Sequence, residues 1–363
     1  MKRLLFFASD FKIGLSQVLA DQLKSLHDGG ADYIAVAGEN EQEPGLSDRL
    51  MNSRIKLMRI NGLDTHKDFK RLVKSIATII KENNIGVVHV QNNWQLALVF
   101  AAKKVTSLFH GPDIVYTIHG FRNNNPHKAV IARMIIGCGL LIMADKVICM
   151  TDYLKNKFGI VSRKTVQLYL GVDDNFFLTD FKAPQIDHLR IIFPAQFRVG
   201  KNQDMIVKAF ADFIKISGDN NAGLLLPGGG DTEPVRRLAK NLGIGDLVSF
   251  PGLLTKEQIK EAYLNSNIAV VASNSETFGQ SIVEPYVLGR CVLSTPVGIA
   301  PEIIHGGENG WIFNSPEELT RIFLELDKNK DRLIAIGKKN YGGRDRFSWV
   351  RITEQYLSSI LSI

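Results

Sequence analysis

The stretch RIIFPAQFRVGKNQDMIVKAF, residues 190–210, contains one complete strand–loop–helix unit. An apolar run with β-branched residues comes first, a polar loop with a glycine follows, and apolar positions then return at helical spacing. Comparable runs recur along the chain, among them GVVHVQ, DIVYTIHG, IAVVAS and CVLST. Strands that alternate with helices are typical of parallel sheets covered on both faces, so the sequence predicts an α/β fold.

The segment TDFKAPQIDHLR, residues 179–190, separates two such series. It is polar, carries a proline and stands directly before a fresh strand, as domain linkers often do. A chain of 363 residues is long enough for two domains that each bury a core. We therefore predict two Rossmann-like parallel-sheet domains facing a cleft, at residues 1–182 and 183–344, followed by a terminal helix at 345–363.

The charge of the chain is uneven. Residues 1–180 hold 23 Lys and Arg against 17 Asp and Glu, a net +6, whereas the remainder holds 21 against 20, a net +1. Such an imbalance suits an anionic membrane surface, an acidic acceptor or nucleic acid. Lysines scattered over solvated helix faces would give the same count, and no tight basic cluster decides between these readings.

The composition points to a globular protein in a reducing compartment. Hydrophobic residues make up 45% and charged residues 22% of the chain. The start MKRLLFFASD reaches an aspartate too early for a secretory leader, and the apolar stretch at residues 129–144 is interrupted by an arginine and two glycines. We expect that stretch to form a buried helix, and Cys138, Cys149 and Cys291 to be packed free thiols. The expected location is the cytoplasm.

The common nucleotide-binding fingerprints are absent from the sequence. The first strand is followed by SDFKIGLSQ with the single Gly14, where a dinucleotide-binding unit needs three spaced glycines. PGGGDTE, residues 227–233, is rich in glycine but lacks the third spaced glycine, and no phosphate-binding P-loop occurs. A dehydrogenase or a P-loop ATPase is therefore disfavoured.

A pair of carboxylates stands in NSETFGQSIVEPYVLG, residues 274–289. Pro285 is tolerated best in the first turn of a helix, so we expect a helix that begins near residues 280–282 and ends by residue 289. Its free amides would then follow Phe278 and Gly279 and suit phosphate or sugar oxygens. On their own, Glu276 and Glu284 read equally well as an exposed loop carboxylate and a helix-start glutamate.

Electrostatics assigns these carboxylates to hydroxyl groups. Two like charges about 6 Å apart at an effective dielectric near 20 cost roughly 3 kcal/mol, so glutamates here would avoid a phosphate. A carboxylate with two acceptor oxygens matches a vicinal diol. Arg198 and Lys201, which follow the strand RIIFPA, would supply the cations that a phosphate needs. Either residue also suits a solvated surface turn.

Five segments together carry a family resemblance. AQFRVGKNQ, LLLPGGGD, VSFPGLL, SETFGQSIVEP and STPVGIAPEII occur in this order, and the chain resembles a retaining GT-B glycosyltransferase of glycosyltransferase family 4. The resemblance covers almost the whole chain, most closely from residue 190 onward. It implies a nucleotide-sugar donor site in the second domain, an acceptor side in the first, and a terminal helix that crosses back onto the first domain.

The resemblance also implies roles for individual residues. Glu276 is expected on the sugar hydroxyls, Glu284 on the ribose, and Arg198 with Lys201 on the diphosphate. His119, after the strand DIVYTI, is expected near the transferred sugar, although it also reads as a partly buried histidine. The remaining donor-binding positions implied are Gly14, Gly229, Leu254, Thr277, Phe278, Gly279, Gln280 and Ser281. His89, inside a strand, is read as a core histidine.

Two positions depart from the family pattern. Leu170, in YLGVDDNFF, stands where asparagine is common, and Arg198 and Lys201 are closer together than in many members. The second departure leaves open which cation meets which phosphate.

The function expected from this resemblance is hexosyl transfer with retention, from a UDP- or GDP-sugar to a glycan or glycolipid hydroxyl in polysaccharide or lipopolysaccharide biosynthesis. We expect neither a metal cofactor nor a nucleic-acid partner. We do expect peripheral contact with the cytoplasmic face of an anionic membrane. Two alternatives stay open: a nucleotide-sugar epimerase on the same architecture, and a non-catalytic sugar-nucleotide-binding module. A retaining glycosidase needs two carboxyl groups about 5 Å apart that act as an acid/base pair. This third reading is disfavoured, because Glu276 and Glu284 stand in one motif beside the expected diphosphate site.

Overall fold

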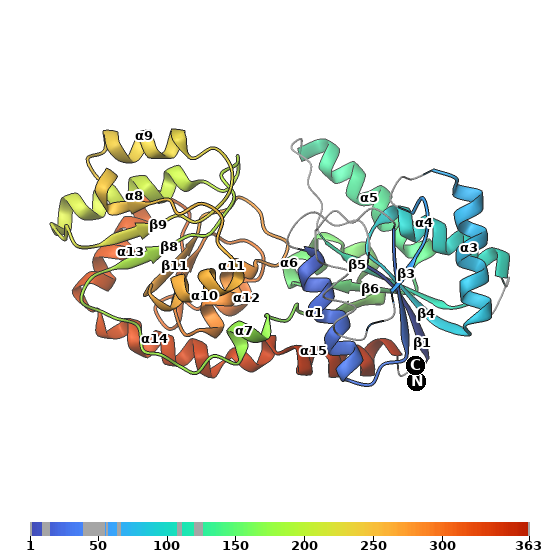
Figure 1. Cartoon of the computed structure of the whole chain (residues 1–363). Helices are drawn as coiled ribbons and strands as arrows, with labels where there is room; N and C mark the ends of the chain where they lie inside the picture. The colour runs from blue at the N-terminus through green and yellow to red at the C-terminus, as the bar shows by residue number, and fades with distance from the viewer. Residues whose placement is uncertain are drawn as a thin grey trace. The chain divides into compact units, whose positions relative to one another are not determined.

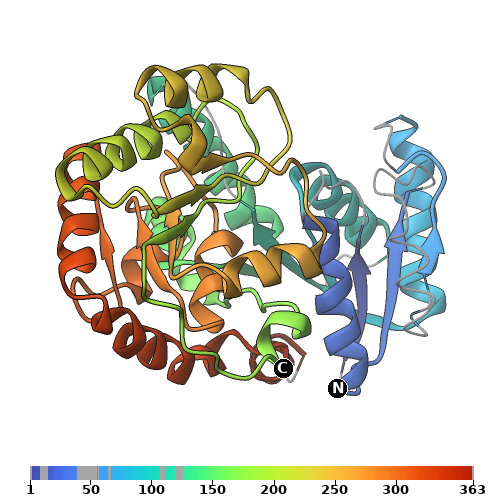
Figure 2. The ribbon, with the colours of Figure 1, turned by 60° about the vertical axis from the view of Figure 1, so that its left-hand side comes forward.

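A computed structural model describes residues 2–8, 15–38, 55, 57–63, 67–106, 111–119 and 126–361 of the chain. The chain divides into two compact units. The first comprises Met1–Gly171 and Trp349–Ile363, and the second comprises Val172–Ser348. Each unit is a parallel sheet with helices on both faces (Figures 1 and 2), so the predicted α/β class with two Rossmann-like domains is confirmed.

The sheet of the first unit has seven parallel strands in the order β3-β2-β1-β4-β5-β6-β7. Helices α1 and α15 pack together, as do α3 and α4 (Figure 1). The strands are β1 (Arg3–Phe7), β2 (Tyr33–Ala37), β3 (Leu57–Arg59), β4 (Ile85–Val90), β5 (Asp113–Ile118), β6 (Lys146–Cys149) and β7 (Thr165–Gln167). The helices are α1 (Leu15–Asp28), α3 (Phe69–Glu82), α4 (Asn93–Thr106), α5 (Pro126–Met143), α6 (Asp152–Lys157), η1 (Gly159–Lys164), α15 (Trp349–Tyr356) and η4 (Leu357–Leu361).

The sheet of the second unit has six parallel strands in the order β10-β9-β8-β11-β12-β13. Helices α8, α9 and α13 lie on one face, and α10, α11 and α14 on the other (Figures 1 and 2). The strands are β8 (Arg190–Ile192), β9 (Gly223–Leu225), β10 (Val248–Ser249), β11 (Ile268–Val271), β12 (Cys291–Ser294) and β13 (Gly310–Ile312). The helices are α7 (Asp174–Phe177), α8 (Gln203–Ser217), α9 (Glu233–Asn241), η2 (Gly245–Leu247), α10 (Lys256–Leu264), α11 (Gln280–Val287), α12 (Ala300–Ile303), α13 (Pro316–Lys328), α14 (Asp331–Gly342) and η3 (Arg344–Phe347).

The predicted boundaries after residues 182 and 344 fall inside the second unit. Contacts within that unit explain the first difference. The ring of Phe176 lies 6.4 Å from that of Tyr263, edge to face, and Lys256 forms an ion pair with Asp173. These contacts fasten α7 to α10, so the second unit begins before the polar segment 179–190.

The C-terminal residues belong to the first unit. The hydroxyl of Ser25 on α1 donates to the carbonyl of Trp349 over 3.0 Å, and the hydroxyl of Tyr356 lies 2.9 Å from Nδ1 of His89 on β4. Tyr356 is 1% exposed, so helix α15 contributes to the core of the first unit.

Helix α11 has the predicted bounds, but the reason given for them is wrong. Pro285 is the sixth residue of the helix and lies in its second turn, where it leaves the carbonyl of Ser281 without its usual helical donor. The start is set by Gly279, which caps the helix at φ +100°, a left-handed conformation that favours glycine.

Helix α5 is not the buried helix that its composition predicts. Four of its large apolar side chains are exposed: Met134 by 60%, Ile135 by 67%, Leu141 by 36% and Ile142 by 73%. Cys138 is exposed between them, whereas Cys149 and Cys291 are packed as predicted. Counted from Met134, the other four exposed residues follow after one, four, seven and eight positions, so all five side chains lie on one face of the helix. No helix within the described residues is both long and apolar enough to span a bilayer.

Candidate functional site

The strand order places a candidate site in the second unit. The order in which the chain adds strands reverses between β8 and β11, and at such a sheet reversal ligands of open parallel sheets bind at the carboxyl ends of the strands. Two hydrogen bonds join the loops that follow these strands. The side-chain amide of Asn202 donates to the carbonyl of Ala272 over 2.7 Å, and the amide of Asn274 donates to the carbonyl of Gly200 over 2.8 Å.

These loops bring Lys201 and Glu276 together as an ion pair. Nζ of Lys201 lies 2.5 Å from Oε1 of Glu276, and the two side chains are 14% and 18% exposed. An ammonium group has three donors and a carboxylate has two acceptor oxygens, so each partner keeps hydrogen-bonding capacity for a ligand. The predicted phosphate cation and the predicted sugar carboxylate therefore share one site.

Arg198 lies in the same turn but points less inward. Its carbonyl accepts a hydrogen bond of 3.2 Å from the amide of Lys201, and its side chain is exposed. An exposed guanidinium at the edge of the turn can reach an anion.

The glycines after β9 support the loop that carries these cations. The amide of Phe197 donates to the carbonyl of Gly229 over 2.8 Å. A Cβ at Gly228 would lie 1.9 Å from the carbonyl oxygen of Ala195, so only glycine fits there. This close backbone packing is sufficient to explain the glycine at position 228, whereas Gly229 stays a candidate for backbone contact with a ligand.

The turn before α11 is fixed from a third loop. The amide of Ile299 donates to the carbonyl of Phe278 over 2.8 Å, and a Cβ at Gly298 would lie 2.2 Å from that oxygen. The ring of Phe278 is 3% exposed and packs 6.4 Å from that of Phe347. The N-terminus of α11, with Gln280 and Ser281 in its first turn and Thr277 just before, is thus held next to Glu276.

Glu284 lies further along α11 in a different environment. The hydroxyl of Tyr263 on α10 donates to its Oε2 over 3.4 Å. Burial raises the pKa of Glu284 to about 7, against the opposing effects of the Lys256 charge and this hydrogen bond, while Asp173 adds to the rise. The carboxyl group therefore changes charge near neutral pH.

Sequence reasoning missed the side chains around Glu284. Lys256 and Tyr263 stand seven residues apart on α10, which is two helical turns, so both face the same way. That spacing was visible in the sequence, but no local pattern linked α10 to α11.

The first unit holds the predicted His119. It follows β5, and its Nε2 lies 2.7 Å from Oε1 of Gln91, which follows the neighbouring β4. Burial lowers the pKa of His119 to about 4, so its imidazole is neutral at pH 7. His89 is a core histidine, as predicted: it is 1% exposed, and burial followed by the His119 charge lowers its pKa to about 3.

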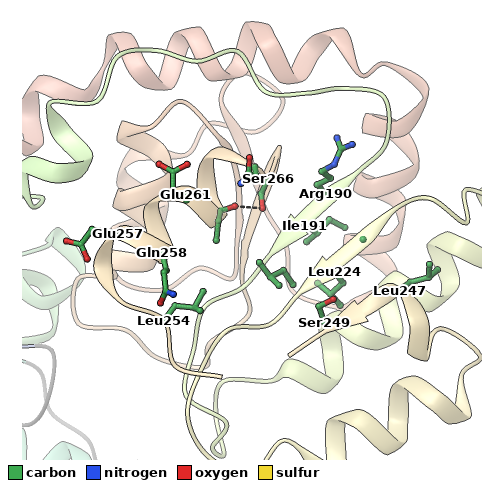
Figure 3. A pocket seen from close by; sticks show the side chains of 14 residues that line it. Arg190, Ile191, Leu224, Leu247, Ser249, Leu254, Glu257, Gln258, Glu261 and Ser266 are labelled. Atoms are coloured by element: carbon green, nitrogen blue, oxygen red, sulfur yellow. Dashed lines mark hydrogen bonds between the residues drawn. The ribbon is translucent and has the colours of Figure 1, made fainter. Parts of the chain in front are cut away.

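One predicted donor-binding residue lies outside the described part of the chain, and another lines a different cavity. Gly14 lies outside the described residues. Leu254 lines a cavity of about 610 Å³ between α10 and strands β8, β9 and β10 (Figure 3), together with Ile191, Leu224 and Gln258. Neither Lys201 nor Glu276 is among the described residues that line this cavity. Among all the residues that the structure describes, no group of three or more His, Cys, Asp or Glu side chains could hold a metal ion.

Comparisons with known families match both halves of the chain. Residues 14–176 match the family described as Glycosyltransferase Family 4, and residues 179–341 match the one described as Glycosyl transferases group 1. Among relatives, an uncharacterised glycosyltransferase of Methanocaldococcus jannaschii is 26% identical over 212 residues, which is 57% of this chain and 56% of that protein. A D-inositol 3-phosphate glycosyltransferase of Gordonia bronchialis is 27% identical over 179 residues, which is 47% of this chain and 39% of the relative. The matches thus span about half or less of these curated relatives.

Solved structures share the fold over the full length. The Anabaena protein HepE, crystallised in complex with UDP and glucose, superposes with a TM-score of 0.78 at 17% identity, covering 100% of both chains. The lipopolysaccharide outer core galactosyltransferase WaaB superposes with a TM-score of 0.74 at 16% identity, covering 99% of both. At these identities the likeness concerns the fold alone.

Proposed function

Because the chain belongs to glycosyltransferase family 4, with the GT-B fold, we propose that it transfers a hexose with retention from a UDP- or GDP-sugar to a glycan or glycolipid hydroxyl. The observation that carries this proposal is the ion pair of Lys201 and Glu276 at the sheet reversal of the second unit. One cation and one carboxylate at the start of a helix suit the diphosphate and the hydroxyls of a nucleotide sugar. HepE was crystallised with UDP-glucose, which supports a similar donor here.

The chemistry follows from where charge develops. When the bond from the anomeric carbon to the phosphate oxygen breaks, negative charge grows on the diphosphate, and Lys201 with Arg198 stabilises it. The acceptor oxygen attacks from the same face of the sugar, and its proton passes to the departing phosphate oxygen. We propose that no metal ion takes part, because these two side chains supply the cations.

A thermal-shift panel of UDP-, GDP- and ADP-sugars tests the donor. A ligand at 100 times its Kd stabilises the folded chain by about 2.7 kcal/mol, which raises Tm by several degrees. We expect a UDP- or GDP-sugar to give the largest rise, unchanged by EDTA. A chain that none of these donors stabilises would contradict the proposal, and an isomerised sugar after incubation with donor alone would favour the epimerase.

We propose further that the acceptor belongs to a membrane surface, and that the protein works in polysaccharide or lipopolysaccharide biosynthesis. The apolar face of α5, defined by Met134, Ile135, Cys138, Leu141 and Ile142, supports this. Arg163 and Lys164 lie beside its C-terminal end, where Nζ of Lys164 donates to the carbonyl of Leu141 over 2.6 Å. An exposed apolar helix face flanked by cations suits an anionic lipid surface.

Co-sedimentation with anionic vesicles tests this face. We expect wild-type protein to bind phosphatidylglycerol vesicles at low salt and to be released at high salt, because the cations contribute through screened attraction. The double change Ile135→Asp and Ile142→Asp should abolish binding, whereas Val350→Asp, at a residue of α15 that is 69% exposed, should leave it intact. No binding by the wild-type chain at low salt would contradict the membrane acceptor.

A further inference from the structure

Three helices of the second unit meet around the carboxyl group of Glu284. Helix α7 packs against both α10 and α11, and Glu284 belongs to α11 (Figure 1). The hydroxyl of Tyr263 on α10 donates to Oε2 of Glu284 over 3.4 Å, and the Tyr263 ring packs on that of Phe176 on α7. Tyr263 is fully buried, whereas Glu284 is half-buried. One oxygen of the carboxyl group is thus held in place, and a ligand can still reach the residue.

Asp173 and Lys256 form an ion pair that joins two of these helices. Nζ of Lys256 contacts Oδ2 of Asp173, and the two side chains are 27% and 19% exposed. The other oxygen of Asp173 caps α7 by accepting from the amide of Asn175 over 2.9 Å. Lys256 lies two turns before Tyr263 on the same face of α10. Both charges are therefore fixed and partly shielded from water, which strengthens their effect on neighbouring groups.

The two charges of this pair act on Glu284 in opposite directions. Burial raises the pKa of Glu284, the Lys256 ammonium group and the Tyr263 hydrogen bond lower it, and the Asp173 carboxylate raises it. The pKa of Glu284 that results is about 7. The charge of this carboxyl group at neutral pH therefore depends on a balance that the loss of either partner would tip.

The other charged residues of α7 and α10 stay outside this balance. Asp174 on α7 and Lys260 on α10 do not contribute to the shift of the Glu284 pKa. Glu257 and Glu261 of α10 line the cavity beside strands β8, β9 and β10 (Figure 3).

The remaining elements packed on α11 direct their charges elsewhere. Arg346 on η3 and Lys339 on α14 act on Tyr286, which stands two residues after Glu284 and so on the opposite side of the helix. Strand β11 has no titratable side chain, and on β12 burial raises the pKa of the Cys291 thiol, which is neutral. Among the described residues, Asp173 and Lys256 are thus the charged pair that acts on Glu284.

The charge of Glu284 matters to the ribose that we assign to it. An ionised carboxylate accepts hydrogen bonds from both hydroxyls of a diol. A protonated carboxyl group carries a hydrogen on one oxygen, so that it can no longer accept from both hydroxyls equally well. A group that favours the ionised form of Glu284 therefore also favours a bound ribose.

We propose that the ion pair of Asp173 and Lys256 controls the ionisation of Glu284 and thereby sets the affinity of the donor site for a nucleotide. Lys256 promotes ribose binding and Asp173 limits it, and both are positioning residues that act through Glu284. The inference rests on the proposed function, since it takes a nucleotide as the ligand.

Two single substitutions, each removing one charge of the pair, test the control of Glu284. Lys256→Met keeps the length of the side chain, and Asp173→Asn keeps a good helix cap. The midpoint pH of Glu284 ionisation should rise by about one unit in Lys256→Met and fall by about one unit in Asp173→Asn. The double variant should return close to wild type, because both charges are gone. Carbon-13 NMR titration of the glutamate carboxyl groups in the free protein measures the midpoint, with Glu284→Gln identifying the signal.

Calorimetric titration with UDP measures the consequence for binding. If only the ionised form binds ribose well, a midpoint one unit higher weakens UDP binding at pH 7 about fivefold, and one unit lower strengthens it about twofold. At pH 9 the carboxyl group is ionised in wild type and in both single variants. Their affinities for UDP should then agree within about twofold.

Three outcomes separate the claims. Midpoints that move in the same direction in both single variants would overturn the inference, because the lost tie between α7 and α10 would then be the cause. Weaker UDP binding by Lys256→Met that persists at pH 9 would also overturn it, since the lysine would then contact the ligand itself. A wild-type chain that does not bind UDP would contradict the uridine donor and the claim on affinity, while opposite movements of the midpoint would still support the control of Glu284.

Discussion

Lys201→Ala should lower kcat/KM for the nucleotide sugar about 100- to 1,000-fold, as the loss of one preorganised group that stabilises transition-state charge does in other enzymes. Lys201 is 14% exposed, so little water can replace its ammonium group beside a diphosphate. The fall should appear mainly in kcat, since the leaving-group charge is larger in the transition state than in the bound donor. Steady-state kinetics with the best donor of the thermal-shift panel measures it.

The same substitution should lower Tm, because it leaves Glu276 partly buried without its cation. Adding Glu276→Gln should restore Tm but not activity, which separates folding from catalysis. Lys208→Ala is the matched control: this lysine lies on α8, is 52% exposed and pairs with Asp204 one turn away. Unchanged donor turnover in Lys201→Ala would show that the phosphate site is elsewhere.

Glu284→Gln should weaken donor binding about 10- to 100-fold at pH 8, the effect of losing hydrogen bonds to a charged group. An ionised carboxylate accepts from both hydroxyls of a ribose, whereas an amide offers one acceptor oxygen. Because the pKa of Glu284 is about 7, wild-type affinity should rise between pH 6 and pH 8, and the variant should lack this rise. Calorimetric titration with UDP at several pH values measures both effects.

Stability should show the opposite dependence on pH. The pKa of Glu284 is raised to about 7 in the folded chain, above the ordinary value of about 4.3 for a glutamate. The folded chain holds this proton more tightly than the unfolded chain, so the resulting stability is full below about pH 4 and is lost as the pH rises through about 7. The Tm of Glu284→Gln should therefore exceed that of wild type increasingly from pH 5 to pH 8.

Glu261→Gln is the matched control, since this glutamate is exposed on the same helix as Tyr263. It should change neither UDP affinity nor the dependence of Tm on pH. A Glu284→Gln variant with the same dependence of UDP affinity on pH as wild type would remove Glu284 from the ribose site.

The sequence predicts the architecture well because the fold depends on repeated local patterns. Each strand–helix unit is visible in a short window, and a family resemblance orders the units. The strand order itself, which places Lys201 and Glu276 at a sheet reversal, is not a local property. Their ion pair, formed across 75 positions of the chain, therefore became visible only in the structure.

Two other failures have physical causes. Pro285 lies inside α11, because the left-handed Gly279 starts the helix earlier than the proline alone requires. The apolar composition of α5 predicted burial, yet composition does not say which side chains a neighbouring element covers, and Met134 and Ile142 stay exposed.

The most direct test of the donor site is a crystal structure of the protein with an intact UDP- or GDP-sugar. It should show the carboxylate of Glu276 at about 2.6 to 3.2 Å from a hydroxyl of the sugar, the carboxylate of Glu284 at a similar distance from a ribose hydroxyl, and Nζ of Lys201 on a phosphate oxygen. A bound donor with neither carboxylate within hydrogen-bonding distance of a hydroxyl would contradict the account.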